Sequence, residues 1–86
     1  MPEISRFFGI IIRMYFDDHQ PAHFHAFYGE FEAVINIETL AIIKGQLPPR
    51  ALGLALEWAS LHQSELKSFW EKAKKNENLG RIEPLK

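Results

Sequence analysis

The chain has 86 residues, of which 47% are hydrophobic and none is cysteine, and its formal net charge is −1 at pH 7. This length and composition predict a single packed domain over residues 1–86 rather than a disordered chain. The near-neutral charge excludes a global field that would draw the protein onto nucleic acid or anionic lipid, and the lack of cysteine excludes disulfides, thiolate zinc sites and cysteine nucleophiles.

The first predicted element is a strand from Phe7 to Phe16, which is rich in β-branched and aromatic residues. Alternation gives it two faces, with Ile10, Ile12, Met14 and Phe16 on one and Ile11, Arg13, Tyr15 and Asp17 on the other. Residues 1–6 lack the basic segment and apolar run of a signal peptide, and the apolar run that follows is too short to cross a bilayer. We therefore expect a cytoplasmic protein with no membrane partner.

The segment from Asp17 to His25 concentrates the ionisable side chains, with three of the four histidines and two adjacent acids around one proline. Residues 17–22 are predicted to form a loop, because Pro21 cannot donate to a strand ladder and adjacent aspartates favour turns. Histidine can donate a proton, accept one or bind a metal near neutral pH. This cluster is therefore where we expect the protein to act.

A hairpin is predicted from a strand over His23–Tyr28 and a strand over Phe31–Glu38, because Gly29-Glu30 between them suits a two-residue type II′ turn. With Tyr28 opposite Phe31, the apolar side chains share one face, which is the predicted core face: Phe24, Ala26, Tyr28, Phe31, Ala33 and Ile35. The other face then pairs Phe27 with Glu32, His25 with Val34, and His23 with Asn36. In this register the two histidines share a face, and Phe24 is buried on the opposite one.

A short fourth strand is expected from Leu40 to Lys44, ended by Gly45. Pro48-Pro49 then opens a helix, and helical periodicity continues from about Arg50 to Lys75. One helix of that length would extend roughly 40 Å, which is long beside a small sheet. The sequence leaves two alternatives, one continuous helix or two helices with a break near Ser60. The break is suggested by Ser60 and Gln63, which have the spacing of a capping box.

Residues 76–80 are expected to end the helical region, with Gly80 as the C-terminal stop. Residues 81–86 are expected to add an edge strand or to contact a partner. The predicted architecture is α+β, an antiparallel three- to four-stranded β-meander packed against one long or two short C-terminal helices.

The histidine cluster first suggests a metal site. His23 and His25 stand two apart on a predicted strand, so their Cβ atoms lie on one face roughly 6–7 Å apart. That separation suits two ligands of one divalent metal ion, and Asp18 or His19 could supply a third. The alternative is a network of hydrogen bonds that closes the loop and needs no metal or other cofactor.

The predicted open face of the sheet suggests a second chemistry. It collects polar and aromatic side chains of several kinds: Arg13, Tyr15, His23, His25, Glu32, Asn36 and Glu38. An arginine for phosphate, histidine and glutamate for proton transfer, and an aromatic ring for base stacking are what metal-independent RNA cleavage needs. Such residues are also common on solvated sheet faces, so the sequence leaves open whether the protein is an enzyme with RNA as its substrate.

Three stretches of the chain resemble a known family. They are residues 1–10, the Asp18-His19-x-Pro21-x-His23-Phe24-His25-Ala26 block, and the helix with Pro49-Arg50-Ala51, Glu57-Trp58-Ala59 and His62. They look like small bacterial and archaeal proteins of domain-of-unknown-function family 4160, and the resemblance covers nearly the whole chain. It implies a partner, because members are typically encoded beside a small protein of domain-of-unknown-function family 2442, as a suspected toxin–antitoxin module. It implies no catalytic residues.

The helix is the expected interaction surface. A second apolar stripe of Leu54, Trp58 and Leu61 adds surface that a small sheet cannot cover. This stripe and the tail from Ile82 to Leu85 are the expected contacts with a genetically adjacent small protein or with a second copy in a homodimer. The leading interpretation is therefore a component of a two-protein, toxin–antitoxin-like module. The alternatives are a metal-independent ribonuclease and a metal-binding module.

Overall fold

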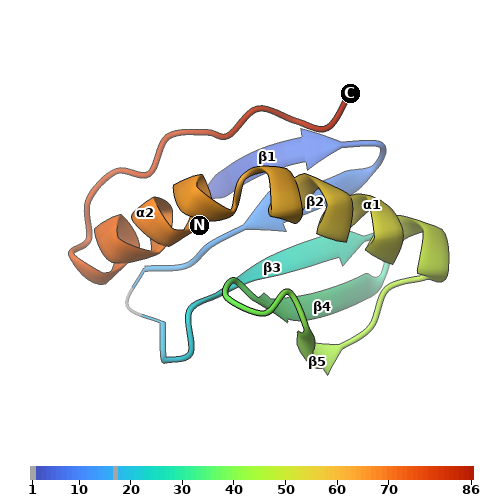
Figure 1. Ribbon diagram of the computed structural model, residues 1–86, viewed down its shortest axis with the longest axis horizontal. Coiled ribbons are helices and arrows are strands. Elements are labelled where there is room, and N and C mark those ends of the chain that lie inside the picture. The colour runs from blue at the N-terminus through green and yellow to red at the C-terminus, as the bar shows by residue number, and fades with distance from the viewer. Residues whose placement is uncertain (1, 17) are drawn as a thin grey trace.

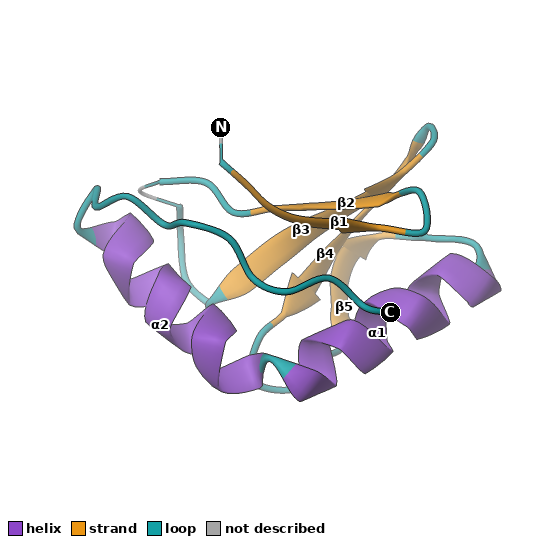
Figure 2. Ribbon diagram, turned by 90° about the horizontal axis from the view of Figure 1, so that it is seen from above, coloured by secondary structure: helices purple, strands orange, loops and turns teal. Residues whose placement is uncertain are grey.

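The computed structural model describes residues 2–16 and 18–86. Met1 and Asp17 lie outside the described residues, and so do the predictions that place Asp17 in a loop and on one face of the sheet. The elements, in chain order, are β1 (Glu3–Phe7), β2 (Ile10–Arg13), β3 (His23–Tyr28), β4 (Phe31–Asn36), β5 (Ile42–Gly45), α1 (Pro49–Leu61) and α2 (Gln63–Lys74). The strands form one antiparallel sheet in the order β1-β2-β3-β4-β5. Both helices lie on the same side of it (Figures 1 and 2), which leaves the other face open.

This arrangement confirms the predicted α+β meander with C-terminal helices, although the sheet has one strand more than the predicted three or four. Neither described helix is long and apolar enough to span a membrane.

The additional strand arises because the stretch predicted as one strand from Phe7 to Phe16 turns back on itself. Phe8 and Gly9 have φ angles of 49° and 80°, and the chain reverses there to pair β1 with β2. Glycine adopts such angles readily but phenylalanine rarely does, so this turn has only a weak signal in the sequence. The predicted alternation holds within β2 and up to Met14, whereas Phe16 lies beyond the strand and is exposed.

The central hairpin has the predicted register, with Tyr28 opposite Phe31 and His25 opposite Val34. Gly29 has a φ of 59°, as the first position of a type II′ turn requires. Phe24 is completely buried, which confirms its predicted place on the core face between the two histidines. The predicted fourth strand is also present, as β5.

The helical region is broken at His62, so the form with two short helices is the one observed. The predicted capping box is wrong, because the Ser60 hydroxyl donates to the Glu57 carbonyl within α1. Instead, the Gln63 side-chain amide donates to the carbonyl oxygens of Ile37 and Glu38 at 2.6 and 2.9 Å. These bonds fix the first residue of α2 to the chain that leaves β4, and they account for the change of direction between the helices (Figure 2).

Asn76, not Gly80, ends the second helix. Its φ is 59°, its N–H donates to the Ala73 carbonyl, and the Glu77 N–H donates to the Lys72 carbonyl. This pair of bonds is a Schellman motif, in which asparagine can take the left-handed position more usual for glycine. The helix therefore ends within the predicted range 76–80, but at Asn76 rather than at Gly80.

Trp58 belongs to the core rather than to an exposed stripe. It is fully buried, and its indole ring lies 5.5 Å from the Phe7 ring and 5.9 Å from the Phe24 ring. The stripe expected to be exposed is thus wrong at Trp58, and Leu54 also packs against the core, whereas Leu61 is 66% exposed. Within this stripe, the chain itself therefore covers Trp58 and Leu54 and leaves Leu61 exposed.

The C-terminal tail is what completes this burial. It runs back alongside β1 (Figure 1), where the Ile82 N–H donates to the Ile4 carbonyl at 2.7 Å. The Glu83 carbonyl accepts a hydrogen bond from the Trp58 indole N–H at 2.8 Å, and the Ile82 side chain is buried. The tail has no strand of its own, so the predicted edge strand is wrong, and its apolar residues contact their own domain.

A further link between the tail and the first strand runs through Glu3, which pairs with Arg81 of the tail and with Arg6 of its own strand. The guanidinium groups of Arg6 and Arg81 lie 2.8 and 3.1 Å from its carboxylate oxygens. Hydrogen bonds from Arg6 and then Arg81 lower the pKa of Glu3 from 4.5 to about 2. Because the pKa is lowered in the folded state, this link contributes its full stability above pH 4.5 and loses it as the pH falls through about 2.

An NMR titration of the Glu3 carboxyl carbon is therefore expected to give a midpoint near pH 2 in the wild-type protein. Arg81→Gln removes one of the two donors, so the midpoint should move up towards 4.5. Lys86→Gln is the control, because Lys86 pairs with Glu83 rather than with Glu3. A wild-type midpoint near 4.5 would show that the tail is not held through Glu3.

Candidate functional site

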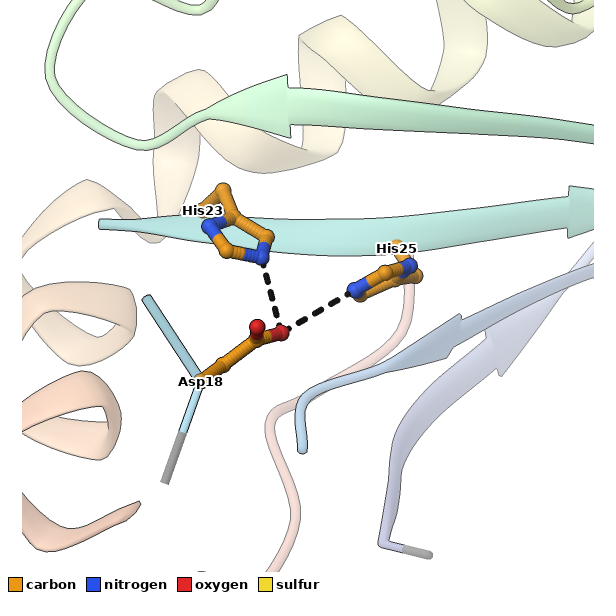
Figure 3. A group of neighbouring side chains, drawn as sticks. All are labelled: Asp18, His23 and His25. Carbon is orange, nitrogen blue, oxygen red and sulfur yellow. Dashed lines mark hydrogen bonds and ion pairs between the residues drawn. The ribbon is translucent and has the colours of Figure 1, made fainter. Parts of the chain in front are cut away.

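The strand β3 and the loop before it bring Asp18, His23 and His25 together (Figure 3). The Nε2 atoms of His23 and His25 lie 2.9 and 3.4 Å from the same oxygen, Oδ2 of Asp18. One nitrogen or oxygen atom from each of the three side chains lies within 4.8 Å of the other two. The predicted placement of both histidines on one face, with an acid from the loop, is therefore confirmed.

His23 is held by the loop and by α2. Its Nδ1 lies 2.7 Å from the Pro21 carbonyl oxygen, and its ring lies 5.1 Å from the Trp70 ring. A carbonyl oxygen only accepts hydrogen bonds, so Nδ1 carries a proton and donates it. In the neutral ring, the lone pair is then on Nε2, which faces Asp18. His23 shares a face of the sheet with His25, but it is only 7% exposed, so the expectation that it is open to solvent is wrong.

His25 is oriented in the same way by a different acceptor. Its Nδ1 lies 3.0 Å from Oε2 of Glu32 on β4, and an ionised carboxylate also only accepts. The Tyr15 ring meets the His25 ring edge-on at 4.5 Å, and the Phe27 ring stacks at 6.4 Å. These contacts leave Nε2 of His25 as the second lone-pair nitrogen that faces Asp18.

The Asp18 carboxyl group favours its ionised form. Burial by itself raises the pKa of Asp18, but the His19 backbone N–H, together with the His23 and His25 rings when these carry a proton on Nε2, outweighs burial and lowers the pKa. The His19 N–H donates to Oδ1 of Asp18 at 2.9 Å. The His19 side chain is exposed and is not one of the three clustered groups, so the structure does not bring this predicted metal ligand to the other three.

The group of Asp18, His23 and His25 is stable only with a positive charge between the three side chains. Two imidazole lone pairs and a carboxylate oxygen repel one another at 2.9 and 3.4 Å unless a proton or a metal ion lies between them. Bonds of about 2.0–2.2 Å to zinc at tetrahedral angles put neighbouring ligand atoms about 3.3 Å apart. The separations of 2.9 and 3.4 Å in the structure lie on either side of that value.

A cavity of about 370 Å³ adjoins the cluster. Residues of the loop, β3, β4 and β5 line it: Asp18, His19, Gln20, Pro21, His23, His25, Glu32, Val34, Ile43, Lys44 and Gly45. A molecule that enters from the open face of the sheet can therefore reach the atoms that face Asp18.

The predicted ribonuclease residues gather only in part. Tyr15 and Glu32 contact His25, and Arg13 pairs with His25 across the sheet, with its guanidinium 5.3 Å from the Phe27 ring centre. These residues surround His25 and not His23.

Two other residues predicted for the open face have partners elsewhere. The Asn36 side-chain oxygen accepts hydrogen bonds from the backbone N–H groups of Glu38 and Thr39. The Glu38 carboxylate forms an ion pair with Lys67 of α2. Neither Asn36 nor Glu38 lines the cavity.

Sequence reasoning missed three groups at the site, namely Lys44, the Pro21 carbonyl and the Trp70 ring. Lys44 lies opposite Val34, so alternation along the fourth predicted strand could have placed it on the open face. The other two depend on the path of the loop and on the docking of α2, for which no local pattern exists.

A family model described as "Domain of unknown function (DUF4160)" matches residues 9–71 of the chain. The matched range runs from the turn before β2 into α2, so it includes the three clustered side chains and every residue that lines the cavity. No curated protein matches the chain, and neither does any solved structure.

Proposed function

Because the chain belongs to the family described as Domain of unknown function (DUF4160), whose description names no activity, we propose a function from the site itself. The protein binds a divalent transition-metal ion, with zinc as the reference case, through Asp18, His23 and His25. One observation carries this proposal. Two imidazoles, each with Nδ1 fixed on an oxygen acceptor, turn Nε2 towards the same carboxylate oxygen.

Metal-binding histidines are typically held in this way. The second ring nitrogen donates to a carbonyl or a carboxylate, which sets the tautomer and the ring orientation. Here the Pro21 carbonyl serves His23, and the Glu32 carboxylate serves His25. A set of two histidines and one aspartate suits zinc and other transition metals better than calcium or magnesium, which prefer oxygen ligands.

The number of ligands indicates a site open to substrate. Structural zinc sites use four protein ligands, whereas catalytic sites use three and leave a position for water or substrate. Three described side chains meet here, beside a cavity, and the His19 side chain is not among them. A metal bound there would supply a Lewis acid at the wall of the cavity.

Zinc titrated into protein purified without a histidine tag is expected to bind at one ion per chain in isothermal calorimetry. A ligand at about 100 times its Kd stabilises the folded state by about 2.7 kcal/mol, which corresponds to a rise in Tm of about 10 °C or more for a domain of this size. Magnesium is the control ion, and His62→Ala is the control variant because His62 bonds to Glu65 on α2. No bound zinc and no thermal shift would overturn the proposal.

Metal-independent cleavage of RNA is the second candidate, supported by the Tyr15, Glu32 and Arg13 side chains around His25. It has less support than metal binding, because His23 is only 7% exposed and because Asn36 and Glu38, which were predicted for the same face, have partners elsewhere. Cleavage that persists after the metal is chelated would favour it.

A role in a two-protein, toxin–antitoxin-like module stays a proposal that rests on the family, as does assembly into a homodimer. The surface for it differs from the predicted one, since Trp58 and Ile82 are buried. The exposed large apolar side chains of the described chain lie at the β1–β2 and β3–β4 turns, after β2, on β5 and at the end of α1: Phe8, Phe16, Tyr28, Phe31, Ile42, Ile43 and Leu61.

A further inference from the structure

Among the described residues that line the cavity beside the three proposed ligands, Lys44 is the one lysine or arginine. Lys44 pairs with Val34 across the sheet, so it stands on the same open face as His25. Lysines 67, 74 and 86 each lie within ion-pair distance of a glutamate, whereas Lys44, like Lys72 and Lys75, has no such partner among the described residues. Its charge is available to a molecule in the cavity.

The backbone at Lys44 is held in place by the residue after it. Gly45 has a φ of 76°, and a Cβ atom there would lie 2.2 Å from the Glu32 carbonyl oxygen. The Gln46 N–H donates to that same oxygen at 3.0 Å. Only glycine lets β5 approach β4 this closely, so the wall that carries Lys44 is built into the fold.

The charge and shape of the cavity select the ligand. A divalent metal ion and Lys44 together carry three positive charges, and Asp18 and Glu32 together carry two negative charges. One positive charge remains for the ligand to neutralise. Val34, Ile43 and Pro21 provide apolar wall on the same cavity. A volume of about 370 Å³ is at the small end of the range for ligand sites.

We infer that the cavity binds a short aliphatic monocarboxylate, with one carboxylate oxygen on the metal, the carboxylate paired with Lys44, and the hydrocarbon chain against Val34 and Ile43. This inference rests on the proposed metal site and adds the class of molecule that occupies its open position. A phosphate group fits less well, because it carries about −1.5 to −2 charges near pH 7.

Calorimetry on the zinc-loaded protein tests the inference, with acetate, butyrate and inorganic phosphate as probes. Butyrate is expected to bind about tenfold more tightly than acetate, because it buries two further methylene groups. It is also expected to bind more tightly than phosphate. Lys44→Gln should weaken butyrate binding about tenfold, since it removes a charge-assisted hydrogen bond.

Lys74→Gln is the matched control, because Lys74 pairs with Glu71 on the outside of α2. Each variant is first titrated with zinc, and butyrate is then titrated into protein that holds one zinc ion per chain. If zinc binds but butyrate binds no better than acetate or phosphate, or binds Lys44→Gln as it binds the wild type, the inference is wrong and the metal site stands. If zinc itself does not bind, the metal site is wrong and the inference falls with it.

Discussion

Replacement of both His23 and His25 by alanine is expected to abolish stoichiometric zinc binding. The two Nε2 atoms are the only nitrogen donors in the cluster, and the Asp18 carboxylate that remains is a poor site for a transition metal on its own. Elemental analysis after dialysis against zinc should give one zinc per wild-type chain and none per chain of the double variant.

Two single variants make this result specific. His19→Ala should bind zinc like the wild type, because the His19 side chain lies outside the group of three. Glu32→Gln should weaken zinc binding by about 10- to 100-fold, since Glu32 orients the His25 ring without joining the group. Because His23 is buried, a thermal unfolding curve must first show that the double variant is folded. A folded double variant that keeps one zinc per chain would place the metal elsewhere.

Trp58→Ala is expected to lower the free energy of unfolding by about 3–5 kcal/mol. The indole ring is fully buried against the Phe7 and Phe24 rings, so its removal leaves a cavity where α1 meets the sheet. It also leaves the Glu83 carbonyl without the indole N–H that now donates to it. For a small domain this is a large share of a total stability of about 5–15 kcal/mol.

Urea unfolding followed by far-ultraviolet circular dichroism measures this loss. Trp58→Phe should lose less, because it keeps an aromatic ring in the core and gives up only part of the volume and one hydrogen bond. Leu61→Ala on the same helix should change stability by less than about 0.5 kcal/mol, because Leu61 is 66% exposed. Equal losses in Trp58→Ala and Leu61→Ala would contradict the burial of Trp58.

The parts of the fold that could be predicted are those in which alternation and turn chemistry agree. The pairing of Tyr28 with Phe31 follows from Gly29 and from an apolar set that tolerates only one register. The turn at Phe8 could not be predicted in the same way, because a phenylalanine with positive φ breaks the local rule that marks turns. The burial of Trp58 depends on a tail that returns from far along the chain, and helical periodicity does not report such a contact.

In the site too, local spacing predicted part of the arrangement, whereas contacts with residues distant in the sequence could not be predicted. Spacing alone placed His23 and His25 on one face, and the acid beside them was a reasonable third member. The burial of His23 was not visible, because it depends on Trp70 from α2 and on the carbonyl of Pro21. Nor could spacing choose between Asp18 and His19, since both come from the same loop and only its path turns one of them towards the strand.

Anomalous diffraction at the zinc absorption edge, from crystals of the untagged protein grown with zinc, tests the central claim most directly. The expected result is one strong peak about 2.0–2.2 Å from Nε2 of His23, Nε2 of His25 and Oδ2 of Asp18, with a further coordination position open to the cavity that Lys44 lines. Crystals in which the three side chains keep the described arrangement, but no anomalous peak lies between them, would contradict it.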